Sequence, residues 1–147
     1  MRKKFLFITL FFISLFTKAQ VTLDVNTIEV DKPVTITVDI NSSQSNCNGL
    51  NNPAKVYMHA GIGNKSNAFG FNVIGNWGKD DGVGEMTSNG DGTYSITITP
   101  QNYFNLTQTQ IQTAAQMGLV FRNETGTQEL KATGCKDFIF PVGKVQV

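Results

Sequence analysis

The chain has 147 residues, of which 12 are basic and 11 acidic, and only 16% of all residues carry a charge. A chain of this length usually forms one domain of ordinary size with its own hydrophobic core. Because positive and negative charges nearly balance, electrostatics give no reason to expect nucleic acid or an anionic membrane as a partner.

Residues 1–20 have the features of a secretory signal peptide. Three positive charges at residues 2–4 precede an apolar run from Phe5 to Phe16, and a small-residue neighbourhood follows. The apolar run is shorter than the ~20 residues that a membrane-spanning helix needs. We therefore expect a secreted protein, periplasmic or extracellular, whose mature part is residues 21–147. Without the signal, 8 basic residues face 11 acidic ones, a net charge of −3.

Most of the mature chain has the pattern of short strands separated by turn residues. Apolar and polar residues alternate in Val34–Ile40 and Tyr94–Thr99, which is typical of half-buried strands. The Asn89–Gly92 sequence between strands favours a tight turn. Further strands are predicted at Val21–Val25, Thr27–Val30, Lys55–Ile62, Phe69–Ile74, Met117–Arg122 and Asp137–Val142.

One short helix is predicted after Pro100, because Thr107 and Gln110 have the spacing of a capping box. About seven short strands with a single short helix predict an all-β fold, an immunoglobulin-like antiparallel β-sandwich. The absence of long helices between the strands argues against parallel α/β folds.

The two cysteines, Cys47 and Cys135, both lie in polar, loop-like surroundings. An even number of cysteines in an exported protein suggests a disulfide. In an immunoglobulin-like sandwich the loops before the third and last strands emerge at the same end, so the sulfurs could meet. Two free thiols or a metal site are the alternatives. The chain has a single histidine and no Cys-x-x-Cys, which argues against zinc.

The candidate binding loop surrounds Trp77, the only tryptophan, which lies between two nearby glycines. A sugar ring has an apolar C–H face that stacks on an aromatic ring and hydroxyls that bind polar side chains. The residues of this loop that fit such a ligand are Trp77, Asn76, Lys79, Asp80 and Asp81. The alternative is a Trp77 ring that plugs the end of the sandwich.

A second candidate patch lies on the strand that carries Tyr57 and His59, which share one face of that strand. They would extend the site if this face is exposed. For His59, the only histidine, the alternative is a hydrogen-bonded residue of the sheet without a ligand.

No motif typical of an enzyme is present. Asp80, Asp81 and Glu85 could act as paired carboxylates in glycoside hydrolysis, but that reaction needs a deep cleft. A solvated acidic loop is the simpler interpretation. Oxygen atoms of the same three residues could also hold calcium, although the spacing of an EF-hand is absent. We therefore expect no catalysis and no cofactor, with calcium at these carboxylates as the one alternative.

Four segments carry a resemblance to a known group of proteins: VYMHAGI, GNWGKDDGVGEM, GTYSITITP and MGLVFRNETGTQE. They resemble the small β-sandwich domains at the front of secreted bacterial α-amylases and, more loosely, the starch-binding carbohydrate-binding modules. The resemblance covers Pro53–Phe140. It implies an immunoglobulin-like fold that binds an α-glucan without catalysis, with a glycan-degrading enzyme as a partner. Two stacking aromatics of those modules are replaced, by Ala60 and by Gln128-Glu129.

Two functions follow from the sequence. The first is a secreted, non-catalytic carbohydrate-binding module for an α-glucan-like polysaccharide. The alternative is a structural or protein-interaction sandwich, used for spacing or adhesion, that binds no glycan. The exposure of the Trp77 ring distinguishes the two.

Overall fold

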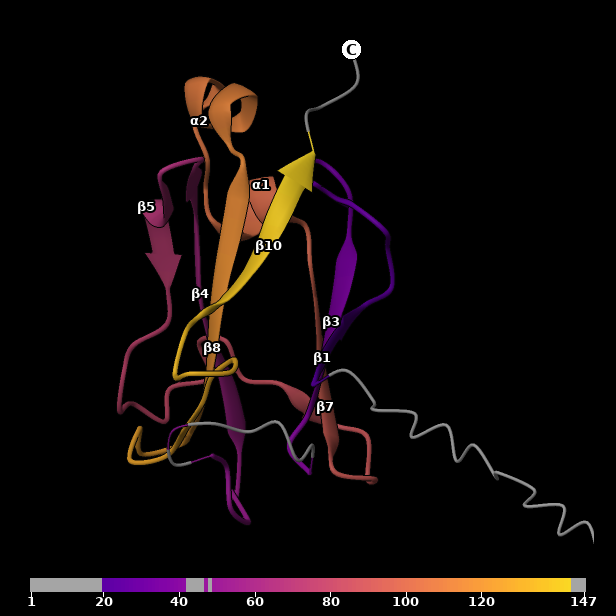
Figure 1. Ribbon diagram of the computed structural model, residues 1–147, viewed down its shortest axis with the longest axis vertical. Helices are drawn as coiled ribbons and strands as arrows, with labels where there is room; N and C mark the ends of the chain where they lie inside the picture. Colours follow the sequence, from indigo (N-terminus) through magenta and orange to yellow (C-terminus); the bar gives the residue numbers. More distant parts are fainter. Residues whose placement is uncertain (1–19, 42–46, 48, 144–147) are drawn as a thin grey trace, which may run out of the picture.

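The computed structural model describes residues 20–41, 47 and 49–143. They form two β-sheets that pack on each other as a sandwich (Figure 1). The first sheet has the order β1 (Val21–Leu23), β3 (Val34–Asp39), β7 (Thr93–Ile98) and β6 (Thr87–Ser88). The second has the order β2 (Ile28–Glu29), β10 (Phe138–Gly143), β8 (Gln116–Asn123), β4 (Val56–Asn64) and β5 (Asn67–Ile74), with β9 (Glu129–Leu130) also paired to β8.

This strand order confirms the predicted immunoglobulin-like sandwich. The first sheet corresponds to the A-B-E-D sheet of that fold, and β10-β8-β4-β5 corresponds to the G-F-C-C′ strands. The pairing of β2 with β10 is parallel, and the other described pairings are antiparallel. The described residues form ten strands and not about seven, because β6 and β9 are too short to produce an alternating pattern. The ends of the predicted strands agree with the structure to within two residues.

The core lies between the sheets and is built from alternate residues of the long strands. In β3, Val34, Ile36 and Val38 are buried while the threonines between them face outward. In β4 and β8 the core residues are Val56, Met58, Ala60, Ile62, Met117, Leu119 and Phe121. Complete burial of such side chains contributes ~1.5–3 kcal/mol each. The opposite residues of β4 and β8 therefore form the outer face of the second sheet.

The two short helices connect β7 to β8. The helix α2 (Gln108–Thr113) begins with the predicted capping box, in which Thr107 and Gln110 bond each other's backbone. The helix α1 (Pro100–Tyr103) is a second short helix, whereas the sequence predicted only one. Proline at its first position suits a helix start, because the missing N–H would have no partner there.

The strands β9 and β10 occupy the same edge of β8 and are two parts of one interrupted strand. Leu130 of β9 lies opposite Phe121, and Phe138 of β10 lies opposite Leu119. The residues between them, 131–137, leave the sheet as a small hairpin. Its base is closed by an ion pair between Lys131 and Asp137, 3.3 Å apart, and by a backbone bridge.

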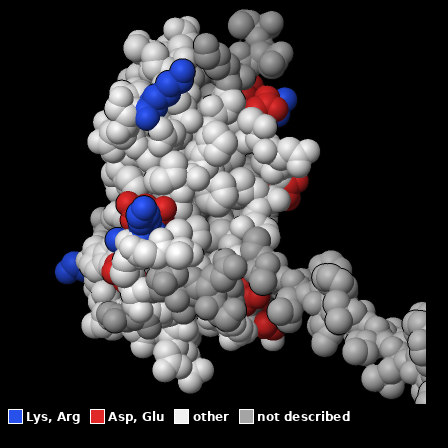
Figure 2. All heavy atoms as spheres, viewed as in Figure 1, with Lys and Arg blue, Asp and Glu red and all other residues white. Residues whose placement is uncertain are grey.

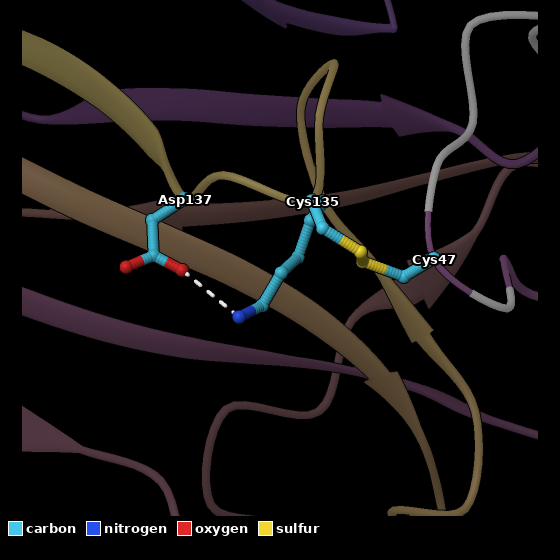
Figure 3. Close-up of a disulfide and its surroundings, with 4 residues drawn as sticks. Cys47, Cys135 and Asp137 are labelled. Atoms are coloured by element: carbon cyan, nitrogen blue, oxygen red, sulfur yellow. Dashed lines mark ion pairs between the residues drawn. A yellow bond between two sulfur atoms is a disulfide. The ribbon is translucent and has the colours of Figure 1, made fainter.

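The tip of this hairpin carries the predicted disulfide. Cys135 is bonded to Cys47, with 5.3 Å between the two Cα atoms, and the Lys131–Asp137 pair lies beside it (Figure 3). The bridge joins the β3–β4 connection to the hairpin, as expected for loops at one end of the sandwich. It closes a separation of 88 residues, which contributes roughly 4–5 kcal/mol in the chain-entropy model.

The predicted signal peptide lies outside the described residues except for Gln20. The backbone carbonyl of Gln20 accepts a hydrogen bond from the Asp39 N–H, and its side chain is buried. The folded part of the chain therefore includes Gln20. Within the described residues, no helix has the length and apolar character needed to cross a membrane.

Candidate functional site

The centre of the outer face of the second sheet lacks side chains of its own, because glycines occupy it. Two glycines lie there, Gly61 on β4 and Gly118 on β8, and the ring of Phe69 packs directly on their backbone. A Cβ atom would lie 2.2 Å from the Phe69 ring at Gly61 and 2.3 Å at Gly118, so only glycine fits. Phe69 thus covers the sheet beside the positions of His59 and Val120.

Arg122 attaches the loop between β5 and β6, residues 75–86 and called the Trp77 loop here, to this face. Its side chain is fully buried, and Nη2 donates to the carbonyls of Asn76 and Lys79, each at 2.9 Å. Nη1 donates to the carbonyls of residues 123 and 124. The guanidinium also lies 4.4 Å from the centre of the Tyr57 ring, a cation–π contact. Such contacts offset the cost of burying a charge, so Arg122 ties the Trp77 loop to the sheet.

Tyr57 provides a second attachment for the same loop. It is fully buried, and its hydroxyl donates a short hydrogen bond to Asp80 and lies 3.2 Å from Oε2 of Glu85. The ammonium of Lys55 lies 2.9 Å from Asp80 and 3.5 Å from Glu85. The Tyr57 hydroxyl first, and then Lys55, holds the pKa of Asp80 below its ordinary value.

The loop also extends the sheet where β5 ends. The N–H of Met58 donates to the Gly84 carbonyl, and the N–H of Met86 donates to the Val56 carbonyl. Residues 84–86 therefore complete the edge of β4 that β5 leaves open. The Trp77 loop is held by backbone bonds, a buried arginine and a buried tyrosine, so it is a rigid part of the domain.

The three carboxylates proposed for calcium do not converge. Asp81 accepts hydrogen bonds from the Asn76 amide at 2.7 Å and from the Val83 N–H at 3.0 Å, and the amide lowers the pKa of Asp81. Asp80 and Glu85 share Lys55 instead of a metal ion. In the part of the chain that the structure describes, no three His, Cys, Asp or Glu side chains could hold a metal together.

Trp77 is fixed along one edge and open on the rest of its surface. Its Nε1 donates to the Gly126 carbonyl at 3.1 Å, and its ring meets His59 edge to face, with 5.4 Å between centroids. Gly126 has φ +70, and a Cβ there would lie 2.8 Å from Nε1. The side chain is still 44% exposed. The Trp77 ring is therefore fixed along one edge and half-exposed, and it is not buried at the end of the sandwich.

Trp77 and His59 line an open pocket of about 240 Å³ on the outer face of the sheet. Phe69 and Val120 supply apolar lining. Three charged side chains complete its lining: Glu129, Lys131 and Asp137. Burial, aided by the charge of Arg122 and opposed by Asp137, lowers the pKa of His59. Since the ordinary value is 6.5, His59 is neutral at pH 7.

The structure divides the sequence-predicted site residues into two groups. Trp77 and His59 come together at the pocket. Tyr57 and Asp80 attach the loop through their side chains, and Asn76 does so through its carbonyl and its bond to Asp81. The backbone carbonyl of Lys79 accepts a hydrogen bond from Arg122, and Lys79 is exposed. Because Tyr57 is fully buried, its ring is not accessible to a ligand in this structure.

The pocket residues that sequence reasoning missed are Phe69, Val120, Glu129, Lys131 and Asp137. Val120 could have been found from the alternation in β8, which places it on the same face as Arg122. Glu129 lies on β9, which is too short to produce an alternating pattern. Lys131 and Asp137 depend on the interruption between β9 and β10, for which the sequence gives no local signal.

These observations define a class of structure. It is an immunoglobulin-like sandwich with a half-exposed tryptophan, fixed along one edge, beside a small open pocket. The sequence matches the family model described as Domain of unknown function (DUF8578) over residues 21–130, and the chain belongs to that family. No curated protein matches the sequence. The matched segment contains Trp77, His59 and Arg122 and ends where the hairpin 131–137 begins.

Proposed function

We propose that the chain is a non-catalytic carbohydrate-binding module that binds an α-glucan-like polysaccharide at the Trp77 pocket. One observation carries this proposal: the only tryptophan of the chain is held by its edge and is open to solvent beside charged groups. A sugar ring stacked on Trp77 would gain roughly 0.5–1.5 kcal/mol beyond its buried area, by analogy with aromatic pairs. The resemblance to starch-binding modules favours an α-glucan as the ligand.

The shape of the pocket supports binding without chemistry. Its volume of about 240 Å³ lies below the ~300–1,000 Å³ of typical enclosed ligand sites, and it is open to solvent. A sugar unit bound there would remain accessible to a partner enzyme. The loop carboxylates Asp80 and Glu85 are bonded to Tyr57 and Lys55. We therefore assign them a structural role and no catalytic one.

The charges of the pocket favour a neutral glycan. Glu129 and Asp137 carry two negative charges, Lys131 carries one positive charge, and His59 is neutral at pH 7. A uronic acid or sulfated sugar would therefore meet a net negative site. Figure 2 shows a largely uncharged face of the molecule, with acidic and basic groups in a few scattered places, some mixed and some of one sign.

We also propose that the protein is secreted, periplasmic or extracellular, where it would act beside a glycan-degrading enzyme. The disulfide supports this proposal, because disulfides persist in oxidising compartments. N-terminal sequencing of the exported protein should begin near Gln20 or Val21. A mature protein that begins at Met1 would refute the signal peptide.

Affinity gel electrophoresis in a panel of polysaccharides tests the function. Soluble starch or glycogen should retard the wild type, and Trp77→Ala should migrate as in a gel without glycan. Val83→Ala is the matched control, since Val83 is an exposed apolar residue of the same loop outside the pocket. Failure of every polysaccharide in the panel to retard the wild type would contradict the proposal.

The second candidate function is a protein-interaction sandwich, and the exposed apolar side chains favour it. Val73 and Ile139 lie opposite Gly61 and Gly118 in the ladder and are 44% and 48% exposed. They add apolar surface to the face that bears Trp77. A Val73→Ser, Ile139→Ser variant with unchanged retardation by glycan would show that sugar binding does not need these residues.

A further inference from the structure

We propose that the disulfide-linked hairpin 131–137 supplies the polar half of the sugar site, in which Lys131 and Asp137 together bind two adjacent free hydroxyls of a neutral sugar. This inference rests on the proposed function and names the sugar hydroxyls that the site would recognise.

Among the described residues, the hairpin has few hydrogen bonds to the rest of the domain. Residues 133–136 at its tip are exposed, and a Cβ built on Gly134 would have no atom within 4 Å. Its internal backbone bonds join Ala132 and Lys136, at 2.7 and 3.3 Å. The disulfide from Cys135 to Cys47 joins the tip covalently to the rest of the domain.

The base of the hairpin lies at the pocket. Lys131 and Asp137 both line it, together with Trp77 and His59. Their side chains are 24% and 37% exposed, so each is accessible to a ligand while partly held by its neighbours. Asp137 and His59 line the same pocket, so a ligand bound there would contact the hairpin base beside the imidazole.

An ammonium group beside a carboxylate suits a pair of neighbouring hydroxyls. One hydroxyl can donate a hydrogen bond to Asp137, which has acceptor capacity beyond the single ion pair with Lys131. The adjacent hydroxyl can accept from Lys131, whose ammonium has three donors. Hydrogen bonds to charged groups are stronger than those between neutral groups. The Trp77 ring would contact the C–H face of the same sugar.

The same pair disfavours an acidic sugar. The positive charge of Lys131 is already neutralised by Asp137, and Glu129 adds a second carboxylate to the pocket. A sugar carboxylate would therefore find repulsion and no free cation among the described pocket residues. A sugar whose adjacent hydroxyls are substituted would lose both hydrogen bonds.

The test is calorimetric titration of the mature protein with a neutral gluco-oligosaccharide, with Lys131→Met and Asp137→Asn as variants. Each should weaken binding about five- to tenfold, since hydrogen bonds to charged groups are worth more than neutral ones. The matched control is the exposed ion pair of Glu29 and Lys32, 2.8 Å apart and outside the pocket. Glu29→Gln and Lys32→Met should bind as the wild type does.

A second measurement separates direct contact from a general effect on the fold. An oligosaccharide methylated on adjacent hydroxyls should bind the wild type weakly, and Asp137→Asn should not weaken it further. A Cys47→Ser, Cys135→Ser variant should also bind the unmodified sugar more weakly at a temperature where circular dichroism shows it folded.

Wild-type affinity in both Lys131→Met and Asp137→Asn would overturn the inference while leaving glycan binding intact. Tighter binding of a uronate than of the neutral sugar would overturn it too. If the wild type bound no sugar, the proposed function itself would fail, and this inference with it.

Discussion

Two segments border the candidate pocket, and the structure holds them in opposite ways. The Trp77 loop is attached by buried groups, with Arg122 and Tyr57 beneath it and backbone bonds along the edge of β4. The hairpin 131–137 stands largely exposed and is held by an ion pair and a covalent bond. The aromatic half of the pocket is thus held by buried side chains of the second sheet, whereas the polar half is expected to change without altering those contacts. Four predictions test this difference.

The largest expected effect is that of removing the charge under the Trp77 loop. Arg122→Met should cost about 3–5 kcal/mol of unfolding free energy, because four carbonyl contacts lose their donor in a buried place. Urea denaturation measures the change. Lys79→Met is the control, since only the carbonyl of Lys79 bonds Arg122, and it should be nearly neutral. Equal stability of Arg122→Met and wild type would mean that the hydrogen bonds from Arg122 do not hold the Trp77 loop.

The second-largest change in unfolding free energy is expected from removing the disulfide. Cys47→Ser with Cys135→Ser should lower the unfolding free energy by about 2–5 kcal/mol, because the unfolded chain regains the freedom of a long loop. Near-ultraviolet circular dichroism at low temperature should still show the Trp77 environment of the wild type. A changed Trp77 signal in the folded variant would contradict the separation of the two segments.

A smaller effect is expected from Tyr57→Phe, which removes one hydroxyl and should cost about 1–2 kcal/mol. Its pH dependence is more informative than its size. The pKa of Asp80 is lowered in the folded state, chiefly by Tyr57, so the stabilisation is present above the ordinary value of 3.8 and is lost as the pH falls below it.

Unfolding free energies measured between pH 7 and pH 2.5 check this. Tyr57→Phe should lose less stability than the wild type on acidification, and the two curves should approach each other at low pH. Parallel curves over the whole range would show that the Tyr57–Asp80 bond does not matter for the loop.

The smallest effect is expected at the hairpin base. Lys131→Met should change the unfolding free energy by less than about 1 kcal/mol, because partly exposed ion pairs contribute little. Thermal denaturation beside Lys32→Met, a member of an exposed pair elsewhere, provides the comparison. A fall in melting temperature as large as that of Arg122→Met would show that the hairpin is part of the core and not an independent segment.

Local patterns were sufficient to predict the fold. Alternation located the long strands, the Thr107–Gln110 spacing located α2, and the positions of Cys47 and Cys135 in two loops at one end indicated the disulfide. Each of these signals is contained within a few neighbouring residues or follows from the topology.

The site depends on contacts that no local pattern records. Arg122 ends an alternating strand, where a charged residue ordinarily faces solvent, and it is buried only because residues 76–79 cover it. Tyr57 is buried where its ring meets Arg122 and its hydroxyl meets Asp80 and Glu85. Lys131 and Asp137 reach the pocket because a strand is interrupted between Leu130 and Phe138. The Trp77 loop was therefore found from composition, and its partners were not.

The interrupted strand also makes the domain a natural acceptor for foreign sequence. Leu130 and Phe138 are eight residue steps apart, while their partners Phe121 and Leu119 on β8 are only two apart. The flanking pairs keep their own registers, so a segment of different length between them need not shift either one. Loop-closure entropy grows slowly with length, by ~0.6 kcal/mol per doubling. A foreign segment between these two positions that keeps Cys135 for its disulfide should therefore leave the flanking strands in register.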